Sequence, residues 1–233
     1  MNFVWTLVLW GAALHGAPAN AAAIVRAVEA HYAHSGTLRA KFYERYRTGK
    51  EGGEAESGTV YFSKPGRMRW EYESPEKKLF LVDGKNVWFY VPADRTASRA
   101  IVNESSDWRT PLALLTGKAH LDRLCRNIEL VAFTPDAAGE TAAPLDLRDE
   151  ILRCLPRESS DPAVGAPFRE ILFEVTPDYR LTRVIIREAG DVETEFRFGN
   201  WQENVAVPES KFHFEPPAGV AIVDEQDLAH QVH

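Results

Sequence analysis

Residues 58–92 decide the fold of this chain, and they read GTVYFSKPGRMRWEYESPEKKLFLVDGKNVWFYVP. Large apolar side chains alternate with polar ones along this stretch, most clearly at Met68, Trp70 and Tyr72. A period of two is typical of a strand that buries one face. Pro65-Gly66 and Ser74-Pro75 interrupt the alternation, and Asp83-Gly84 is the dipeptide of a two-residue hairpin turn, because both of its positions accept a positive φ. The stretch therefore predicts four antiparallel strands that share one apolar, aromatic face.

The rest of the chain continues the strand pattern. Further strands are expected at residues 38–47, 97–102, 126–133, 149–155, 171–175, 181–188, 192–198 and 220–223. Apolar residues with helical spacing predict one helix over residues 22–35. A sheet of about eleven strands has to curl. The predicted fold is therefore mainly β, a curved antiparallel sheet that forms an incomplete β-barrel and is covered by short helices.

Two motifs resemble the LolA family of periplasmic lipoprotein carriers. In residues 64–92 a basic residue and Pro lead into an aromatic-rich strand, a Pro turn, a hydrophobic strand, Asp83-Gly84, and a W-x-Y-x-P pattern at Trp88, Tyr90 and Pro92. FHFEPPAGV at residues 212–220 is similar to the F-x-F-x-P-P-x-G-V ending of that family. The resemblance covers roughly residues 22–224. It implies the same incomplete barrel, with a hydrophobic cavity for acyl chains.

Length and charge narrow the class of protein. A chain of 233 residues suits one domain with a large core. The net charge is -7 and the sequence pI is near 5.6, which argues against nucleic acid as the main partner, because phosphate backbones attract basic surfaces.

The first 21 residues contain no Asp, Glu, Lys or Arg. Their apolar run at 3–14 is too short to span a bilayer, and Ala19-Asn20-Ala21 forms an A-x-A cleavage pattern. We therefore predict a signal peptide at 1–21, a LolA-like domain at 22–224 and a polar, disordered tail at 225–233. The expected location is the periplasm. An uncleaved anchor is the alternative, because only the α-amino group gives the N-terminal region a positive charge.

Motifs of catalysis are missing from the sequence. It contains no G-x-S-x-G, H-E-x-x-H or C-x-x-C pattern and no Gly-rich phosphate loop, so neither an enzyme nor a cofactor is expected. His31 and His34 are interpreted as two exposed helix residues and not as metal ligands. Acidic residues that alternate with apolar ones are interpreted as a solvated outer face of the sheet.

Aromatic residues are unusually frequent at strand positions. The candidate acyl-binding residues are Phe42, Phe62, Met68, Trp70, Tyr72, Phe89, Phe173, Phe196 and Phe198. The pattern alone favours a densely packed core, and it is the resemblance to the LolA family that favours a cavity.

A short apolar helix is predicted between the strands. Thr110 and Pro111 form an N-cap and N1 pair, Gly117 ends the segment, and the apolar positions are Leu112, Leu114 and Leu115. The helix either caps the core or forms a lid over a cavity. In the LolA family an Arg at the position of Lys64 is associated with closing that lid. Lys lacks the planar guanidinium fork, so Arg67 and Arg69 are alternative lid-closing residues.

The only cysteines, Cys125 and Cys154, lie on two strands that are expected to pair as a hairpin. In an oxidising compartment such a pair predicts a disulfide, worth about 2–4 kcal/mol. Two buried free thiols are the alternative.

The resemblance also implies partners. The chain would take acylated lipoproteins from an inner-membrane ABC exporter and pass them to an outer-membrane acceptor lipoprotein or directly to the outer membrane, acting as a monomer. The alternative function is a binding module or sensor for other envelope lipids.

Overall fold

The computed structural model describes residues 20–49, 53–102, 112, 115–117, 120–131, 144–157 and 168–224. The predicted signal peptide up to residue 19, the polar tail from residue 225, and Thr110, Pro111 and Leu114 lie outside these ranges. No helix within them is both long enough and apolar enough to cross a bilayer.

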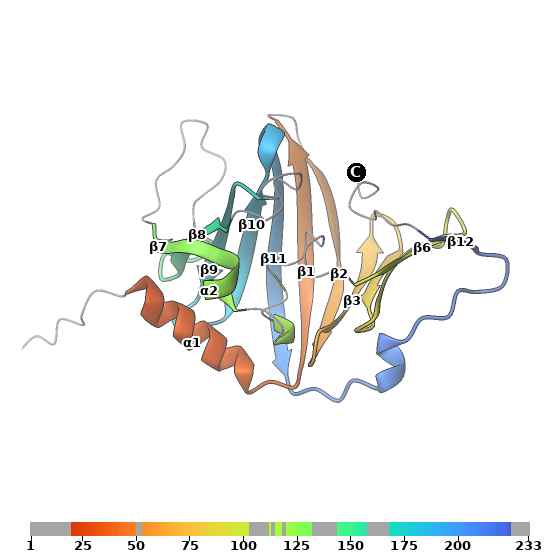
Figure 1. Ribbon diagram of the computed structural model, residues 1–233, viewed down its shortest axis with the longest axis horizontal. Helices are drawn as coiled ribbons and strands as arrows, with labels where there is room; N and C mark the ends of the chain where they lie inside the picture. The colour runs from red at the N-terminus through yellow and green to blue at the C-terminus, as the bar shows by residue number, and fades with distance from the viewer. Residues whose placement is uncertain are drawn as a thin grey trace, which may run out of the picture.

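Twelve strands form one curved sheet in the described part of the chain (Figure 1). They are β1 (Thr37–Thr48), β2 (Glu54–Ser63), β3 (Arg67–Ser74), β4 (Lys78–Val82), β5 (Asn86–Val91), β6 (Thr96–Ile101), β7 (Cys125–Leu130), β8 (Glu150–Pro156), β9 (Glu170–Val175), β10 (Leu181–Arg187), β11 (Val192–Glu203) and β12 (Ala221–Asp224). Their spatial order is β12-β6-β5-β4-β3-β2-β1-β11-β10-β9-β8-β7. The edge strands β12 and β7 are not neighbours, so the predicted mainly β, incompletely closed sheet is confirmed.

One pairing departs from the antiparallel prediction. β12 lies parallel to β6, with Ile222 opposite Ala97. The C-terminal chain has first crossed the sheet and therefore reaches this edge running in the same direction as β6.

Two α-helices and two 3₁₀ turns with bounds inside the described residues accompany the sheet. They are α1 (Ala21–Ala33), α2 (Leu121–Leu124) and the 3₁₀ turns η2 (Ala189–Asp191) and η3 (Glu209–Phe212). Asn20 caps α1 by accepting a hydrogen bond from the N–H of Ala22 at 2.9 Å. The apolar stripe of α1 packs against the sheet through Ile24, Val25, Val28 and Tyr32. α1 and α2 lie together on the β7–β10 side, while the C-terminal chain passes round the β3–β6 side (Figure 1).

The face of the sheet that α1 covers is called the inner face here. Strand register keeps large apolar groups on this face from one strand to the next, because residues directly opposite each other point the same way. Phe42 lies opposite Phe198, and Trp70 lies between Val60 and Phe80. The main hydrophobic core therefore sits between the inner face and α1.

The β7–β8 hairpin carries the predicted disulfide. Cys125 and Cys154 are bonded to each other, with Cα atoms 5.5 Å apart, and both are buried. Cys125 directly follows α2, so the bond fixes this helix to the sheet.

The C-terminal strap, defined as residues 205–220, covers part of the outer face. Phe212 is buried against Leu79, Leu81 and Trp88, and the ring of Phe214 lies 5.4 Å from that of Trp88. The motif at residues 212–220 thus forms a second, smaller core on the other side of the sheet.

The remaining outer face carries a ladder of ion pairs. Six charges of alternating sign, one from each strand, follow the order Arg47, Glu193, Arg187, Glu170, Arg153, Glu129 across β1, β11, β10, β9, β8 and β7. The expectation of solvated acidic residues on this face is wrong for Glu174, Glu193 and Glu195, which are buried. Each is covered by arginine side chains from the neighbouring strands.

Candidate functional site

The candidate acyl-binding residues gather on the inner face, where they form one aromatic cluster. Trp70 is at its centre, with ring centroids 4.8 Å from Phe42, 5.4 Å from Phe196, 6.0 Å from Phe62 and 6.2 Å from Phe198. Tyr72 joins the cluster through Phe42 at 5.0 Å. These rings, with Met68 and Phe173, are all buried, and Phe89 is half-buried. The inner face is therefore packed in this structure.

Trp201 belongs to the same cluster, although sequence reasoning did not select it. Its ring lies 5.4 Å from Phe198 and 6.0 Å from Tyr32 of α1. Strand alternation alone would place residue 201 on the opposite face from Phe198. Between Gly199 and Gln202, β11 has one more residue than the facing part of β1. This β-bulge reverses the alternation along β11.

Tyr32 fastens α1 to the sheet from within the core. Its hydroxyl accepts a hydrogen bond from the N–H of Leu181 at 2.9 Å, and Trp201 donates its Nε1–H to the Leu181 carbonyl at 2.8 Å. Burial raises the pKa of the Tyr32 hydroxyl, which therefore stays protonated.

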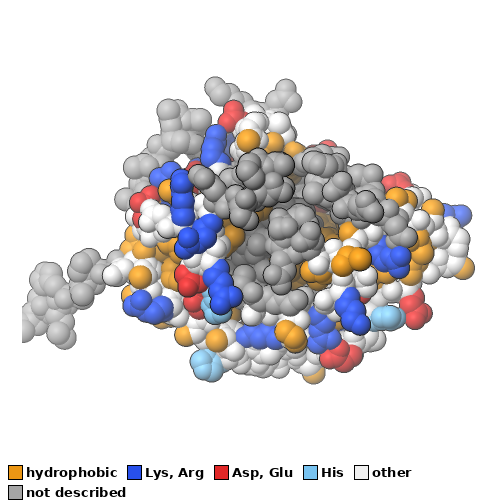
Figure 2. All heavy atoms as spheres, viewed as in Figure 1, with side chains coloured by type: hydrophobic (Ala, Val, Ile, Leu, Met, Phe, Trp, Pro, Cys, Tyr) orange, Lys and Arg blue, Asp and Glu red, His pale blue; other side chains and the backbone are white. Residues whose placement is uncertain are grey.

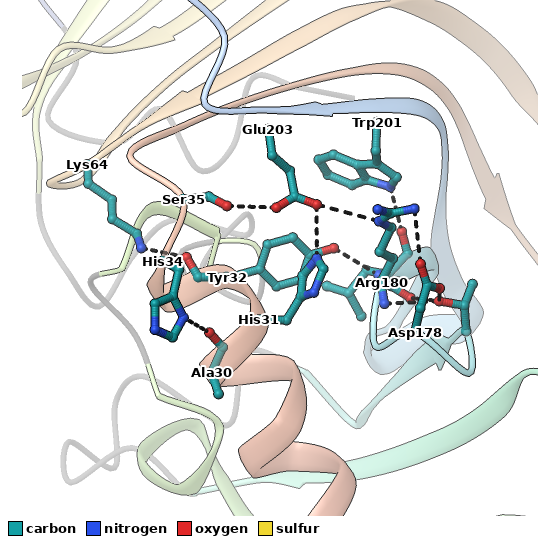
Figure 3. A network of polar contacts seen from close by, with 12 residues as sticks. Ala30, His31, Tyr32, His34, Ser35, Lys64, Asp178, Arg180, Trp201 and Glu203 are labelled. Atoms are coloured by element: carbon teal, nitrogen blue, oxygen red, sulfur yellow. Dashed lines mark hydrogen bonds and ion pairs between the residues drawn. The ribbon is translucent and has the colours of Figure 1, made fainter.

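The last turn of α1 is also held by His31 and Ser35 (Figure 3). Glu203 accepts a hydrogen bond from Ser35 at 2.9 Å, and its carboxylate lies 3.1 Å from His31 Nε2 and 3.5 Å from Arg180 Nε. Burial acts to raise the pKa of Glu203, but these partners outweigh it and hold the pKa below its ordinary value. The interpretation of His31 as an exposed residue is wrong, because only 20% of its side chain is accessible. His34 is exposed and bonds to the Ala30 carbonyl.

Lys64 completes the attachment of α1. Its ammonium donates to the carbonyl oxygens of Tyr32 at 2.5 Å and of Ala33 at 2.8 Å. Carbonyls in the last turn of a helix have no partner within the helix, and they form the negative end of its dipole. Desolvation lowers the pKa of Lys64. The hydrogen bonds and ion pairs that attach this turn to the sheet through Lys64, Tyr32 and Glu203 are called the α1 latch below.

The segment predicted as a lid lies beside the α1 latch. Leu112 and Leu115 are buried in the main core. Thr116 accepts a hydrogen bond from the N–H of Gly66 at 3.1 Å. A Cβ at Gly117, where φ is +73°, would come 3.1 Å from Lys64 Cε. Lys64 therefore lies between α1 and the 115–117 segment.

Arg67 and Arg69 do not share this location. Both side chains point to the outer face, because they alternate with Met68 and Trp70. Arg67 pairs with Glu209 and lies over the ring of Phe212, and Arg69 donates to the Lys211 carbonyl at 3.0 Å. In this structure both side chains contact the C-terminal strap, so among the described residues it is Lys64 that lies beside the predicted lid segment.

The chain is similar in sequence to known proteins. Residues 33–141 match the family model described as outer membrane lipoprotein carrier protein LolA. An outer-membrane lipoprotein carrier protein of Chromobacterium violaceum is 30% identical over 213 residues, which cover 89% of this chain and 90% of that protein. The chain belongs to the LolA family.

A further relative and a solved structure are also similar to this chain. The outer-membrane lipoprotein carrier protein of Nitrosomonas europaea is 28% identical over 169 residues, covering 72% of each protein. The crystal structure of an uncharacterized conserved protein from Thermus thermophilus superposes with a TM-score of 0.52 at 14% identity, covering 88% of this chain and 99% of that one. The second likeness shows that the two proteins have the same fold.

The inner face of this LolA-family chain becomes polar toward the end of β1. Glu44 is 8% exposed and accepts a hydrogen bond from the Tyr72 hydroxyl at 2.7 Å. Glu56 lies opposite Glu44 and accepts from Lys78 Nζ at 2.5 Å. Glu44 is a further exception to the expected outer acidic face, because it has the strand parity of Leu38, Ala40 and Phe42.

One group among the described residues has the composition of a metal site. It contains Glu29, His120 and Asp122. Glu29 already accepts a hydrogen bond from the N–H of Leu121 at 2.8 Å, and His120 and Asp122 are exposed. The group joins α1 to α2, and a helix contact accounts for it.

Polar side chains border the surface that carries α1. In the space-filling view, Lys and Arg side chains extend along the left and lower parts, with hydrophobic side chains scattered between them (Figure 2). Among the coloured side chains, the apolar groups do not form one continuous patch on this side.

Proposed function

We propose that the protein binds the acyl chains of lipoproteins against its inner face and carries them through the periplasm from an inner-membrane ABC exporter to the outer membrane. The observation that carries this proposal is the aromatic inner face of a LolA-family chain, closed by a helix that lies outside the sheet. Because α1 contributes no strand, it can move away while the sheet keeps its hydrogen bonds.

Acylated lipoproteins need such a carrier for a simple physical reason. Exposing an acyl chain to water costs about 0.8 kcal/mol per CH₂, or about 12 kcal/mol for a chain of about sixteen carbons. A carrier that offers an apolar face removes this cost without any covalent step.

The packed inner face makes the exchange reversible. Cargo has to displace α1, whose Ile24, Val25, Val28 and Tyr32 are buried. Exposing four such side chains costs about 6–12 kcal/mol, at about 1.5–3 kcal/mol each. That cost is of the same size as the gain from covering one acyl chain. A near balance of this kind lets the carrier both take up and release its cargo.

The test is to purify the protein from the periplasm under mild conditions and identify the bound molecules by mass spectrometry. Triacylated lipoprotein is the expected result. Free lipid without lipoprotein would instead favour a carrier or sensor of other envelope lipids, and a preparation without any acyl group would contradict the proposal.

A further inference from the structure

A hydrogen bond joins α1 to the short helix α2, away from the α1 latch. Glu29 of α1 accepts this bond from the N–H of Leu121, the first residue of α2, at 2.8 Å. Its second carboxylate oxygen lies 3.6 Å from Nδ1 of His120. The first N–H groups of a helix have no partner within the helix. His120 stands at the N-cap of α2, and within the described residues its side chain makes no capping hydrogen bond, so α1 supplies the acceptor that α2 lacks.

α2 itself is held firmly to the sheet. It ends at Cys125, which is bonded to Cys154 of β8. Arg157, which directly follows β8, donates from its guanidinium to the carbonyl oxygen of Asp122 at 3.0 Å. Leu121 is only 1% exposed and belongs to the main core. The covalent bond, this hydrogen bond and the buried leucine therefore keep α2 in place.

α1 is tied to the sheet by the chain at its C-terminal end. Residues 34–36 connect it directly to Thr37, the first residue of β1. When cargo displaces α1, the helix can therefore separate furthest at its N-terminal half, where Ile24 and Val28 are buried. Glu29 lies next to that half, and its contact with α2 has to break in this motion.

We propose that α2 is the fixed support against which α1 closes, that Glu29 positions α1 on this support, and that the Cys125–Cys154 bond thereby sets how readily the carrier exchanges acyl cargo. Weakening either attachment favours the state in which α1 has moved away, and acyl cargo binds that state. This inference rests on the proposed acyl-binding function and adds a control of the same site.

Amide hydrogen exchange at Leu121, measured by NMR on the mature protein, reports the contact directly. Without cargo, the hydrogen bond to Glu29 should protect this amide. Loading with a synthetic triacylated lipopeptide should speed its exchange by about tenfold. The amide of Cys125, which donates to the Leu121 carbonyl, should stay protected. Unchanged protection of Leu121 in the loaded protein would show that α1 remains on α2 and would overturn the inference.

Glu29→Ala removes the acceptor and leaves the buried stripe of α1 intact, because the side chain of Glu29 is only half-buried. We expect this variant to bind a fluorophore-labelled triacylated lipopeptide about threefold to tenfold more tightly. Release to acceptor membranes should slow by a similar factor. Glu29→Gln keeps an acceptor oxygen and should restore most of the native behaviour. Arg26→Ala alters an exposed residue of the same helix and should change neither step.

The direction of the change separates positioning from a merely structural role. If Glu29 only maintained the fold, its removal would leave lipopeptide binding unchanged or weaken it. Either result in Glu29→Ala would overturn the inference.

A double-mutant cycle tests the part played by the disulfide. The combined substitution Cys125→Ala and Cys154→Ala should also tighten lipopeptide binding, because α2 is no longer fixed. Adding Glu29→Ala to this variant should then have clearly less effect than in the native protein, since both changes act through the position of α2. Fully additive effects would show that the disulfide does not act through this contact. If the cysteine variant does not fold, Arg157→Ala, which loosens α2 from the surface, takes its place in the cycle.

Failure of the proposed function would look different. If the labelled lipopeptide does not bind to the native protein, acyl binding is wrong and this inference fails with it. If the lipopeptide binds, but neither the protection of Leu121 nor the affinity of Glu29→Ala changes, acyl binding stands and the role of α2 as a support is wrong.

Discussion

The C-terminal strap and α1 cover opposite faces of the sheet, and they are attached in different ways. The C-terminal strap on the outer face is held by buried aromatic side chains, with Phe212 only 5% exposed, and by β12, which joins the sheet itself. On the inner face, α1 packs through four apolar side chains and forms no strand. Its last turn is fixed by the α1 latch, a small set of hydrogen bonds and ion pairs from Lys64, Tyr32 and Glu203.

This difference separates a permanent cover from a movable one. Removing the strap would break strand pairing and expose a second core. Moving α1 breaks hydrogen bonds that each contribute only about 0.5–1.5 kcal/mol net, because water replaces the lost partners. It also exposes the four apolar side chains of α1, a cost that the covering of an acyl chain offsets. We infer that the outer cover maintains the fold, and that the inner cover is the part that responds to cargo.

The largest expected effect lies in the aromatic cluster of the inner face. Trp70→Ala should lower the free energy of unfolding by about 4–5 kcal/mol, because rings contact Trp70 on several sides and the substitution leaves a void. Thermal or urea unfolding of the cargo-free protein measures this loss. A loss below about 2 kcal/mol would mean that Trp70 lines an open cavity in solution and that the inner face is not packed.

The next effect tests the permanent cover. Phe212→Ala should cost about 3–4 kcal/mol by emptying the core under the strap. The variant should still capture lipoprotein from donor membranes at a temperature where it is folded, because Phe212 lies on the face opposite the aromatic cluster. A stable variant that lost only lipoprotein capture would contradict the assignment of separate roles to the two covers.

Strand alternation in the sequence was sufficient to predict the four strands within residues 58–92, because turn residues mark each end and large apolar side chains dominate one face. It also placed Met68, Trp70 and Tyr72 on one face. Long-range attachments could not be predicted in this way. Arg67 and Arg69 look like candidates for a lid when only their charge and position are considered, and only the path of the strap reveals their true partners.

Two residues lie on the inner face against the expectation from sequence, and each case has a physical cause. Trp201 turns inward because β11 has one extra residue relative to β1 between Gly199 and Gln202, and this bulge shifts the register by one residue. The apolar alternation along β11 does not reveal the extra residue. Glu44 follows the alternation and is buried on the inner face, where it accepts a hydrogen bond from Tyr72, and the absence of a side chain at Gly58 lets Tyr72 reach it. The expectation that every carboxylate on a strand points to the outer face does not consider a hydrogen-bond donor that lies two strands away.

The smallest expected effect on stability comes from the α1 latch. The substitution Lys64→Met tests directly whether α1 is held less firmly than the C-terminal strap. Met fills the space of the aliphatic stem but donates nothing to the carbonyls of Tyr32 and Ala33. We expect the free energy of unfolding to fall by only about 1–2 kcal/mol.

The same change should have a larger consequence for exchange of cargo. Lys64 stabilises the closed, cargo-free state, so its loss shifts the equilibrium toward the state in which α1 has moved away. Acyl cargo binds that state, and its affinity should rise by about tenfold for each 1.4 kcal/mol removed from the closed state. Release to acceptor membranes should slow correspondingly.

Two control variants accompany this test. Lys64→Arg keeps the charge and donors, and its uptake and release rates should be close to those of the native protein. Lys41→Met removes an outer-face cation and should change neither step. Equal uptake and release rates in Lys64→Met and the native protein would show that α1 is not the cover that cargo displaces.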